Sequence, residues 1–126
     1  MNKRLVLVFS IVSGMLFSGC DNYVSCDSTS AIHLAEEIIN KDIAGNGNMK
    51  IDDNMIMVLK EDSNGNYLCK AQIEGKYNEN YKPGPLYLEH YGIEYDRNTN
   101  NLNGWITFTI SNTTKGNNFY LEIIKN

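Results

Sequence analysis

The chain has 126 residues, of which 42% are hydrophobic, and its formal net charge is −4. This length suits one small domain whose core is near the lower limit for independent folding. The acidic excess argues against nucleic acid as a partner and against attachment to anionic lipid through a basic patch.

The N-terminal residues have the order of a secretory signal. Two basic residues precede an almost unbroken apolar run at residues 5–12, which is shorter than the roughly 20 apolar residues that a membrane-spanning helix needs. Two small residues then stand directly before Cys20, and small side chains there let the backbone approach a peptidase closely. We therefore predict that residues 1–19 are a cleaved signal peptide.

The end of this signal, Leu-Phe-Ser-Gly-Cys at residues 16–20, resembles the lipobox of bacterial lipoproteins, although Phe17 stands where leucine is commonest. The resemblance implies that the Cys20 thiol receives diacylglycerol, that Cys20 becomes the N-terminus, and that acyl chains such as palmitate anchor the protein to a membrane. Two or three chains give stable anchoring where one is marginal. The alternative is an ordinary secretory signal with a cysteine nearby by chance.

The residue after this cysteine indicates which membrane. Asp21 resembles the retention signal of enterobacterial lipoproteins, so we expect the protein to face the periplasm from the inner membrane, with the outer membrane as the alternative. Residues 20–26 would then be a lipidated tether and residues 27–126 a single globular domain. Removal of residues 1–19 takes away two basic residues and no acidic one, so the formal charge would become −6.

One amphipathic helix is predicted directly after the tether. It begins near Asp27 or Ser28, where N-cap residues are frequent, and it ends at Gly45 and Gly47. Apolar residues recur in it at spacings of three and four, and polar residues lie on the other face. The apolar face consists of Ala31, Ile32, Ala35, Ile38, Ile39 and Ile43.

The rest of the chain is typical of β-strands joined by short turns. Strands are predicted at residues 55–61, 67–77, 86–95, 102–111 and 119–125. Asn64-Gly65 is a strong hairpin signal between the first two. Alternation in three strands points one set of side chains inward, namely Tyr67, Cys69, Ala71, Ile73, Ile106, Phe108, Ile110, Phe119, Leu121 and Ile123. One N-terminal helix on about five antiparallel strands defines an α+β fold, similar in element order to cystatin-like or NTF2-like rolls.

Cys26 and Cys69 are expected to form a disulfide. With Cys20 used for lipid, they remain as an even pair in an oxidising compartment. Cys69 belongs to the inward series, and it should face the helix that Cys26 precedes. The bridge would stabilise the domain by roughly 4 kcal/mol in the chain-entropy model. A metal site is disfavoured, because it needs clustered ligands and the chain has only two histidines, far apart in the sequence.

No motif indicates catalysis. Residues 96–100 match the start of a calcium-binding loop, but Asn101 and Thr107 occupy the positions that require glycine and glutamate, so a simple turn is preferred. His33 has glutamates three and four residues further on, which suits a general base but more often a solvated helix pair. We therefore expect that the protein is not an enzyme and that it binds no cofactor and no metal.

Tyrosines concentrate between residues 77 and 95, around a Lys-Pro-Gly-Pro loop. Tyrosine suits recognition surfaces because it combines apolar area with a polar tip, although such rings also complete thin cores. The candidate partner contacts are Tyr77, Tyr81, Lys82, Pro83 and Tyr87.

Together these features predict a non-enzymatic envelope lipoprotein that binds another envelope protein through its sheet or loops. One alternative is an inhibitor or an immunity (exclusion) type lipoprotein with a protruding loop at residues 78–85. Another is a small enzyme with a pocket on an NTF2-like frame. The element order is also loosely similar to that of small enterobacterial lipoproteins of unassigned role, which share a lipobox, one helix and a Tyr-x-Cys strand.

Overall fold

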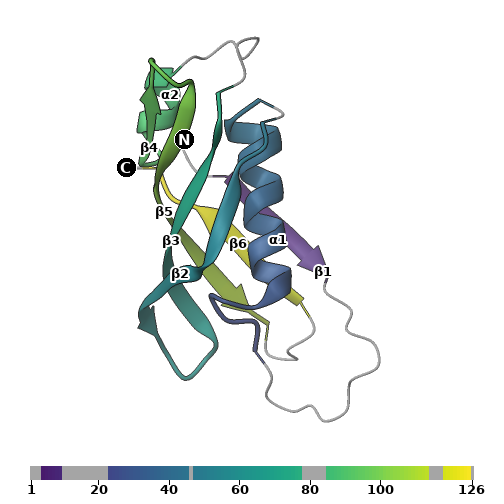
Figure 1. Ribbon diagram of the computed structural model, residues 1–126. Coiled ribbons are helices and arrows are strands. Elements are labelled where there is room, and N and C mark those ends of the chain that lie inside the picture. The colour runs from purple at the N-terminus through teal and green to yellow at the C-terminus, as the bar shows by residue number, and fades with distance from the viewer. Residues whose placement is uncertain (1–3, 10–22, 46, 78–84, 114–117, 126) are drawn as a thin grey trace.

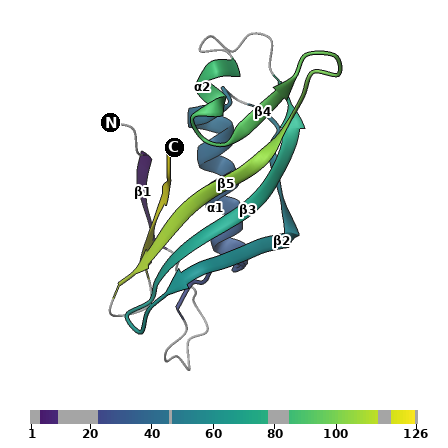
Figure 2. The ribbon, with the colours of Figure 1, turned by 90° about the vertical axis from the view of Figure 1, so that its left-hand side faces the viewer.

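A long helix lies across one face of an antiparallel sheet in the computed structural model (Figures 1 and 2), which describes residues 4–9, 23–45, 47–77, 85–113 and 118–125. This arrangement confirms the α+β class. In chain order the elements are β1 (Arg4–Phe9), α1 (Thr29–Ile38), its π-helical continuation η1 (Ile39–Ile43), β2 (Lys50–Glu61), β3 (Asn66–Lys76), α2 (Pro85–Glu89), β4 (Ile93–Asp96), β5 (Asn101–Asn112) and β6 (Asn118–Ile123).

The helix forms where the apolar period predicts it. Ser28 precedes α1, and its hydroxyl accepts a hydrogen bond from the Ser25 N–H (2.9 Å) instead of capping a helical N–H. Beyond α1 the turns widen into η1, and Gly45 then takes a positive φ of 58°. The Asn40 side chain accepts from the Met49 N–H (2.6 Å) and donates to the Met49 carbonyl (3.0 Å). It therefore holds the returning chain against the end of the helix.

The strand order is β1-β6-β5-β3-β2, with β4 paired to β5, and the pairs are antiparallel. β5 lies at the centre, with β3 along one side and β4 and β6 following each other along the other side. Strands β2 to β6 are the expected five. β1 adds a sixth strand from residues predicted above to belong to a signal peptide, and it pairs with β6 from Arg4↔Ile123 to Phe9↔Asn118.

The prediction of one strand at residues 86–95 is correct only for its last three residues. The chain forms the short helix α2 there, turns at Gly92 with a φ of 85°, and continues into the short strand β4. Pro85 suits the first position of a helix, where a missing N–H costs nothing, and it cannot donate to a sheet. The absence of apolar alternation in this stretch is consistent with that outcome.

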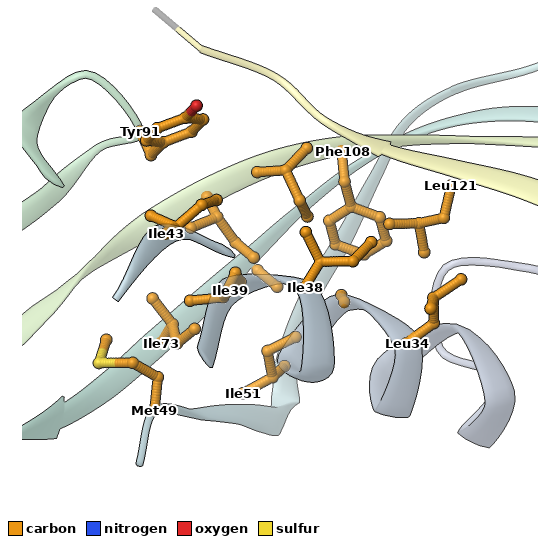
Figure 3. Close-up of a cluster of buried hydrophobic side chains, with 14 of the residues drawn as sticks. Leu34, Ile38, Ile39, Ile43, Met49, Ile51, Ile73, Tyr91, Phe108 and Leu121 are labelled. Carbon is orange, nitrogen blue, oxygen red and sulfur yellow. The ribbon is translucent and has the colours of Figure 1, made fainter. Parts of the chain in front are cut away.

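The core lies between α1 and the sheet (Figure 3). Nine of the ten side chains predicted to point inward from β3, β5 and β6 are fully buried, and the tenth, Tyr67, packs partly buried against them. Leu34, which the predicted helix face omits, is also buried, while Ile32 is only partly so. Figure 3 shows the apolar side of α1 and η1 directed at Ile73, Phe108 and Leu121. The sequence pattern therefore defines most of the core.

Candidate protein-binding surface

The predicted disulfide links the start of the helical region to the sheet. Cys26 and Cys69 are bonded, with their Cα atoms 5.6 Å apart, and both side chains are fully buried. The bridge fixes the residues before α1 to the inner face of β3, where the alternation of β3 places Cys69.

The residues just before Cys26 are fixed to the same end of the sheet. The Asn112 side chain accepts from the Val24 N–H (2.9 Å) and donates to the Val24 carbonyl (2.9 Å). It also donates to the Gly65 carbonyl (2.7 Å) in the turn between β2 and β3. The segment predicted as a tether is therefore packed on the domain from residue 23 onward, while Cys20 lies outside the described residues.

Two of the predicted contact tyrosines help to build the fold. Tyr77 packs against Tyr95 with ring centroids 4.7 Å apart, and Tyr87 meets Tyr91 edge-on at 5.6 Å. Tyr77 and Tyr87 are partly buried against the core, and the Lys125 ammonium lies 5.7 Å from the Tyr87 ring centroid. These rings therefore complete the core at the end of the molecule that carries α2. The other predicted contacts, Tyr81, Lys82 and Pro83, lie outside the described residues.

The groups considered for acid–base chemistry are engaged elsewhere or exposed. His33 and His90 are both exposed. Near His33, Glu36 accepts a hydrogen bond from the Ile51 N–H (2.8 Å), and Glu37 pairs with Lys41 (3.1 Å). Both glutamates therefore stabilise α1 or its junction with β2.

The oxygen-rich segment at residues 96–100 forms a turn. The Asp96 carboxylate accepts from the Asn98 N–H (2.9 Å), and Asn100 takes a positive φ of 64°. Within the part of the chain that the structure describes, no three His, Cys, Asp or Glu side chains are grouped so as to hold a metal ion.

The most unusual surface lies on the edge strand β2. Four large apolar side chains within five consecutive residues are exposed there: Met55 (41%), Met57 (44%), Val58 (48%) and Leu59 (47%). We call these four residues the β2 apolar cluster. A fifth exposed large hydrophobic residue, Tyr120 (39%), stands apart on β6. Val58 lies opposite the inward-facing Cys69 and Met57 lies opposite Lys70, so the four side chains occupy both faces of this sheet edge. Scattered apolar residues on a surface are ordinary, but a group of them along one exposed sheet edge indicates an interaction site.

Irregular pairing explains why this apolar run remains outside the core. Ile51 pairs with Ile73 and Ile56 with Ala71, so the four residues between the two isoleucines lie opposite a single residue of β3. A second shift between Val58 and Lys60 leaves Leu59 without a partner in the ladder. Bulges of this kind bend an edge strand and redirect its side chains, so β2 places only Ile51 and part of Ile56 against the core.

Charged residues border the β2 apolar cluster at both ends. Asp52 and Asp53 precede it, and Glu61 and Asp62 follow it, against the two basic residues Lys50 and Lys60. Hydrogen bonds from the Asn66 side chain and backbone hold the pKa of the Asp62 carboxyl below its ordinary value. The cluster therefore lies in an acidic setting.

A shallow hollow of ≈ 380 Å³ lies beside the end of the cluster. It is lined by the ends of β2, β3 and β5, including Lys60, Leu68 and Thr109. The surface therefore combines protruding apolar side chains with a concavity, which suits a protein partner.

Sequence reasoning missed the β2 apolar cluster. The segment Met-Ile-Met-Val-Leu at residues 55–59 is identified correctly as part of a strand, but its exposure is not predicted. The available signal is the lack of alternation, because one face of a strand cannot bury five consecutive apolar residues.

Comparison with models of protein families, with curated proteins and with solved structures gives no match. Among the described residues, no helix is both long and apolar enough to cross a membrane. The arguments about function therefore depend on the residues of this chain alone.

Proposed function

We propose that this chain is a lipid-anchored, non-enzymatic envelope protein that binds another envelope protein through the edge of its sheet. The observation that carries the binding role is the β2 apolar cluster, four large apolar residues that are each more than 40% exposed. An exposed apolar edge is a liability unless something covers it. Its acidic border favours a partner surface that combines apolar and basic side chains.

The anchor is proposed from the sequence at residues 16–20. Lipidation of Cys20 would place the domain outside the cytoplasm, where a Cys26–Cys69 disulfide persists. Mass spectrometry of the protein extracted from membranes tests this step: we expect an N-terminal, acylated Cys20. An unmodified Cys20, or a Cys20→Ala variant cleaved at the same bond, would remove the anchor from the proposal.

Site-specific photocrosslinking in living cells tests the binding role. A photoreactive phenylalanine in place of Met57 should give one discrete heavier adduct, because this side chain is exposed at the centre of the cluster. The same residue in place of Tyr120, which is comparably exposed on β6, is the matched control and should give none. Addition of Leu59→Lys should abolish the Met57 adduct. Adducts at both positions, or at neither, would contradict a binding surface on β2, and an adduct of twice the protein's mass would indicate a second copy instead.

A further inference from the structure

The described residues nearest to the proposed lipid site are held against one end of the fold. Tyr23 packs so closely on the turn between β2 and β3 that a Cβ added at Gly65 would lie 3.0 Å from its ring. The Asn112 side chain joins Val24 to the Gly65 carbonyl. Cys20 is three residues before Tyr23, so a fully extended chain separates their Cα atoms by at most about 11 Å.

We propose that the lipid on Cys20 holds the end of the domain that carries the β2–β3 turn against the bilayer, so that the β2 apolar cluster binds a protein embedded in that same membrane. This inference rests on the proposed function, and it adds the orientation of the domain and the class of partner.

The dimensions of the sheet support this orientation. β3 has 11 residues, which span about 36 Å. The β2–β3 turn and the start of α1 lie at one end of the molecule, and α2 and β4 lie at the other (Figures 1 and 2). Val58 pairs with Cys69, four residues along β3 from Gly65, which is about 13 Å. Met57 pairs with Lys70, five residues from Gly65, and Met55 lies beyond Ile56, which pairs with Ala71. The cluster therefore extends from about 13 Å to about 23 Å from the anchored end, within reach of the extramembrane part of a protein embedded in the same membrane.

Charge favours a protein over the bilayer itself as the occupant. Among the residues that the structure describes, the end proposed to be anchored carries the acidic residues Asp27, Glu61 and Asp62 against Lys60. Anionic headgroups attract basic segments and repel acidic ones. The apolar side chains beside these carboxylates therefore fit a partner protein that supplies basic groups.

Two matched turns allow the orientation to be measured. Asn64 and Asn98 are both exposed, and the backbone N–H of each donates to an aspartate two residues earlier, at 2.9 Å in both cases. Their side chains can therefore be replaced without loss of these bonds. We would label Asn64→Cys and Asn98→Cys in the full acylated protein, reconstituted in phosphatidylcholine vesicles whose headgroups carry a short-range quencher. Strong quenching at position 64 and background quenching at position 98 are expected. Equal quenching at both positions, or more at position 98, would overturn the orientation.

A longer tether provides the control for this geometry. Insertion of about 20 Gly/Ser residues after residue 22 allows an end-to-end distance of about 25 Å. It should equalise the quenching at positions 64 and 98 and lower the yield of the Met57 adduct, while lipidation is unchanged. An undiminished adduct yield would show that the partner does not need the domain close to the membrane.

The class of partner is decided by two further measurements. The Met57 adduct should stay in the membrane pellet after an alkaline wash that strips peripheral proteins. An adduct that the wash releases would overturn the membrane-embedded partner and leave the proposed function standing, whereas the absence of any adduct would refute both. A label on Met57→Cys that an acyl-chain quencher reaches in protein-free phosphatidylcholine or phosphatidylglycerol vesicles would show that the bilayer itself is the occupant.

Discussion

Gly104 is a residue at which the neighbouring backbone leaves no room for a side chain. It lies in β5 opposite Ile93, and a Cβ added there would overlap the carbonyl oxygen of Gly92. That same oxygen accepts a hydrogen bond from the Trp105 N–H (3.2 Å), so it cannot move away without breaking the contact between β4 and β5.

Gly104→Ala should therefore lower the free energy of unfolding by about 2 kcal/mol or more, because overpacking against rigid backbone has no cheap relaxation. Urea denaturation of the disulfide-intact domain measures the change. Asn103→Ala, at the exposed neighbouring position, serves as control and should stay within about 0.5 kcal/mol of the parent. Equal effects of the two substitutions would refute the steric argument.

Tyr67 gives the domain a dependence on alkaline pH. Burial raises the pKa of its hydroxyl above the ordinary value of 10.0, and the carboxylate of Glu61 adds to the shift. The folded state therefore keeps this proton at pH values where the unfolded state has lost it. The resulting stabilisation is complete below pH 10 and is lost as pH rises above the ordinary value toward that of the folded state.

Tyr67→Phe should consequently flatten the fall in unfolding free energy between pH 9 and pH 11 relative to the parent. Parallel denaturant titrations at several pH values across this interval measure the difference. Tyr120→Phe changes a more exposed ring and should leave the slope unaltered. A slope that is the same in all three proteins would rule out Tyr67 as its source.

At the scale of elements, the disulfide is the main covalent link between the two layers. Cys26→Ala and Cys69→Ala should each lower the free energy of unfolding by about 2–5 kcal/mol, since each removes the same bond. The double variant should be no less stable than either single one, because the two effects are not independent. Thermal unfolding of the three variants tests this equality, and additive losses would indicate that the thiols act through packing alone.

The predictability of each element follows from what determines it. β3, β5 and β6 alternate because α1 covers one face of the sheet, so their inward residues are visible in the sequence. The path from Pro85 to Gly92 depends on a missing donor and a positive φ, neither of which a search for alternation detects. The outward course of β2 depends on its place at the edge of the sheet, which is a property of the topology.

At the scale of the whole molecule, the two candidate binding regions differ in how well the sequence predicts their exposure. The tyrosines are conspicuous in the sequence, yet Tyr77 and Tyr87 are partly buried against the core. The residues of the β2 apolar cluster look like an ordinary strand, yet they are exposed. Local composition predicts which residues can form apolar contacts. Only the assembled sheet determines which of them are buried in the core and which remain exposed.

Strand β1 consists of residues that the signal prediction removes. It covers the outer edge of β6. Its first residue, Arg4, pairs with Ile123 of β6, so this pairing joins the two ends of the chain. The Asn118 carbonyl and the Ile124 N–H bond toward β5, so by the alternation of a strand the N–H groups of Phe119, Leu121 and Ile123 face β1. In the precursor these three N–H groups would be hydrogen-bonded to β1, and in the mature protein, which lacks β1, they would not.

In a Cys20→Ala precursor that retains residues 1–19, these amides should exchange slowly with deuterium, while in the protein that begins at Cys20 they should exchange much faster. Exchange followed by mass spectrometry measures this, with the β3 amides, paired to β5 in both forms, as the internal control. Equal protection of the β6 amides in the two forms would contradict the pairing of β1 with β6 in the precursor. Cleavage would then change which strand forms one edge of the sheet, β1 in the precursor and β6 in the mature protein, while β2 remains the opposite edge.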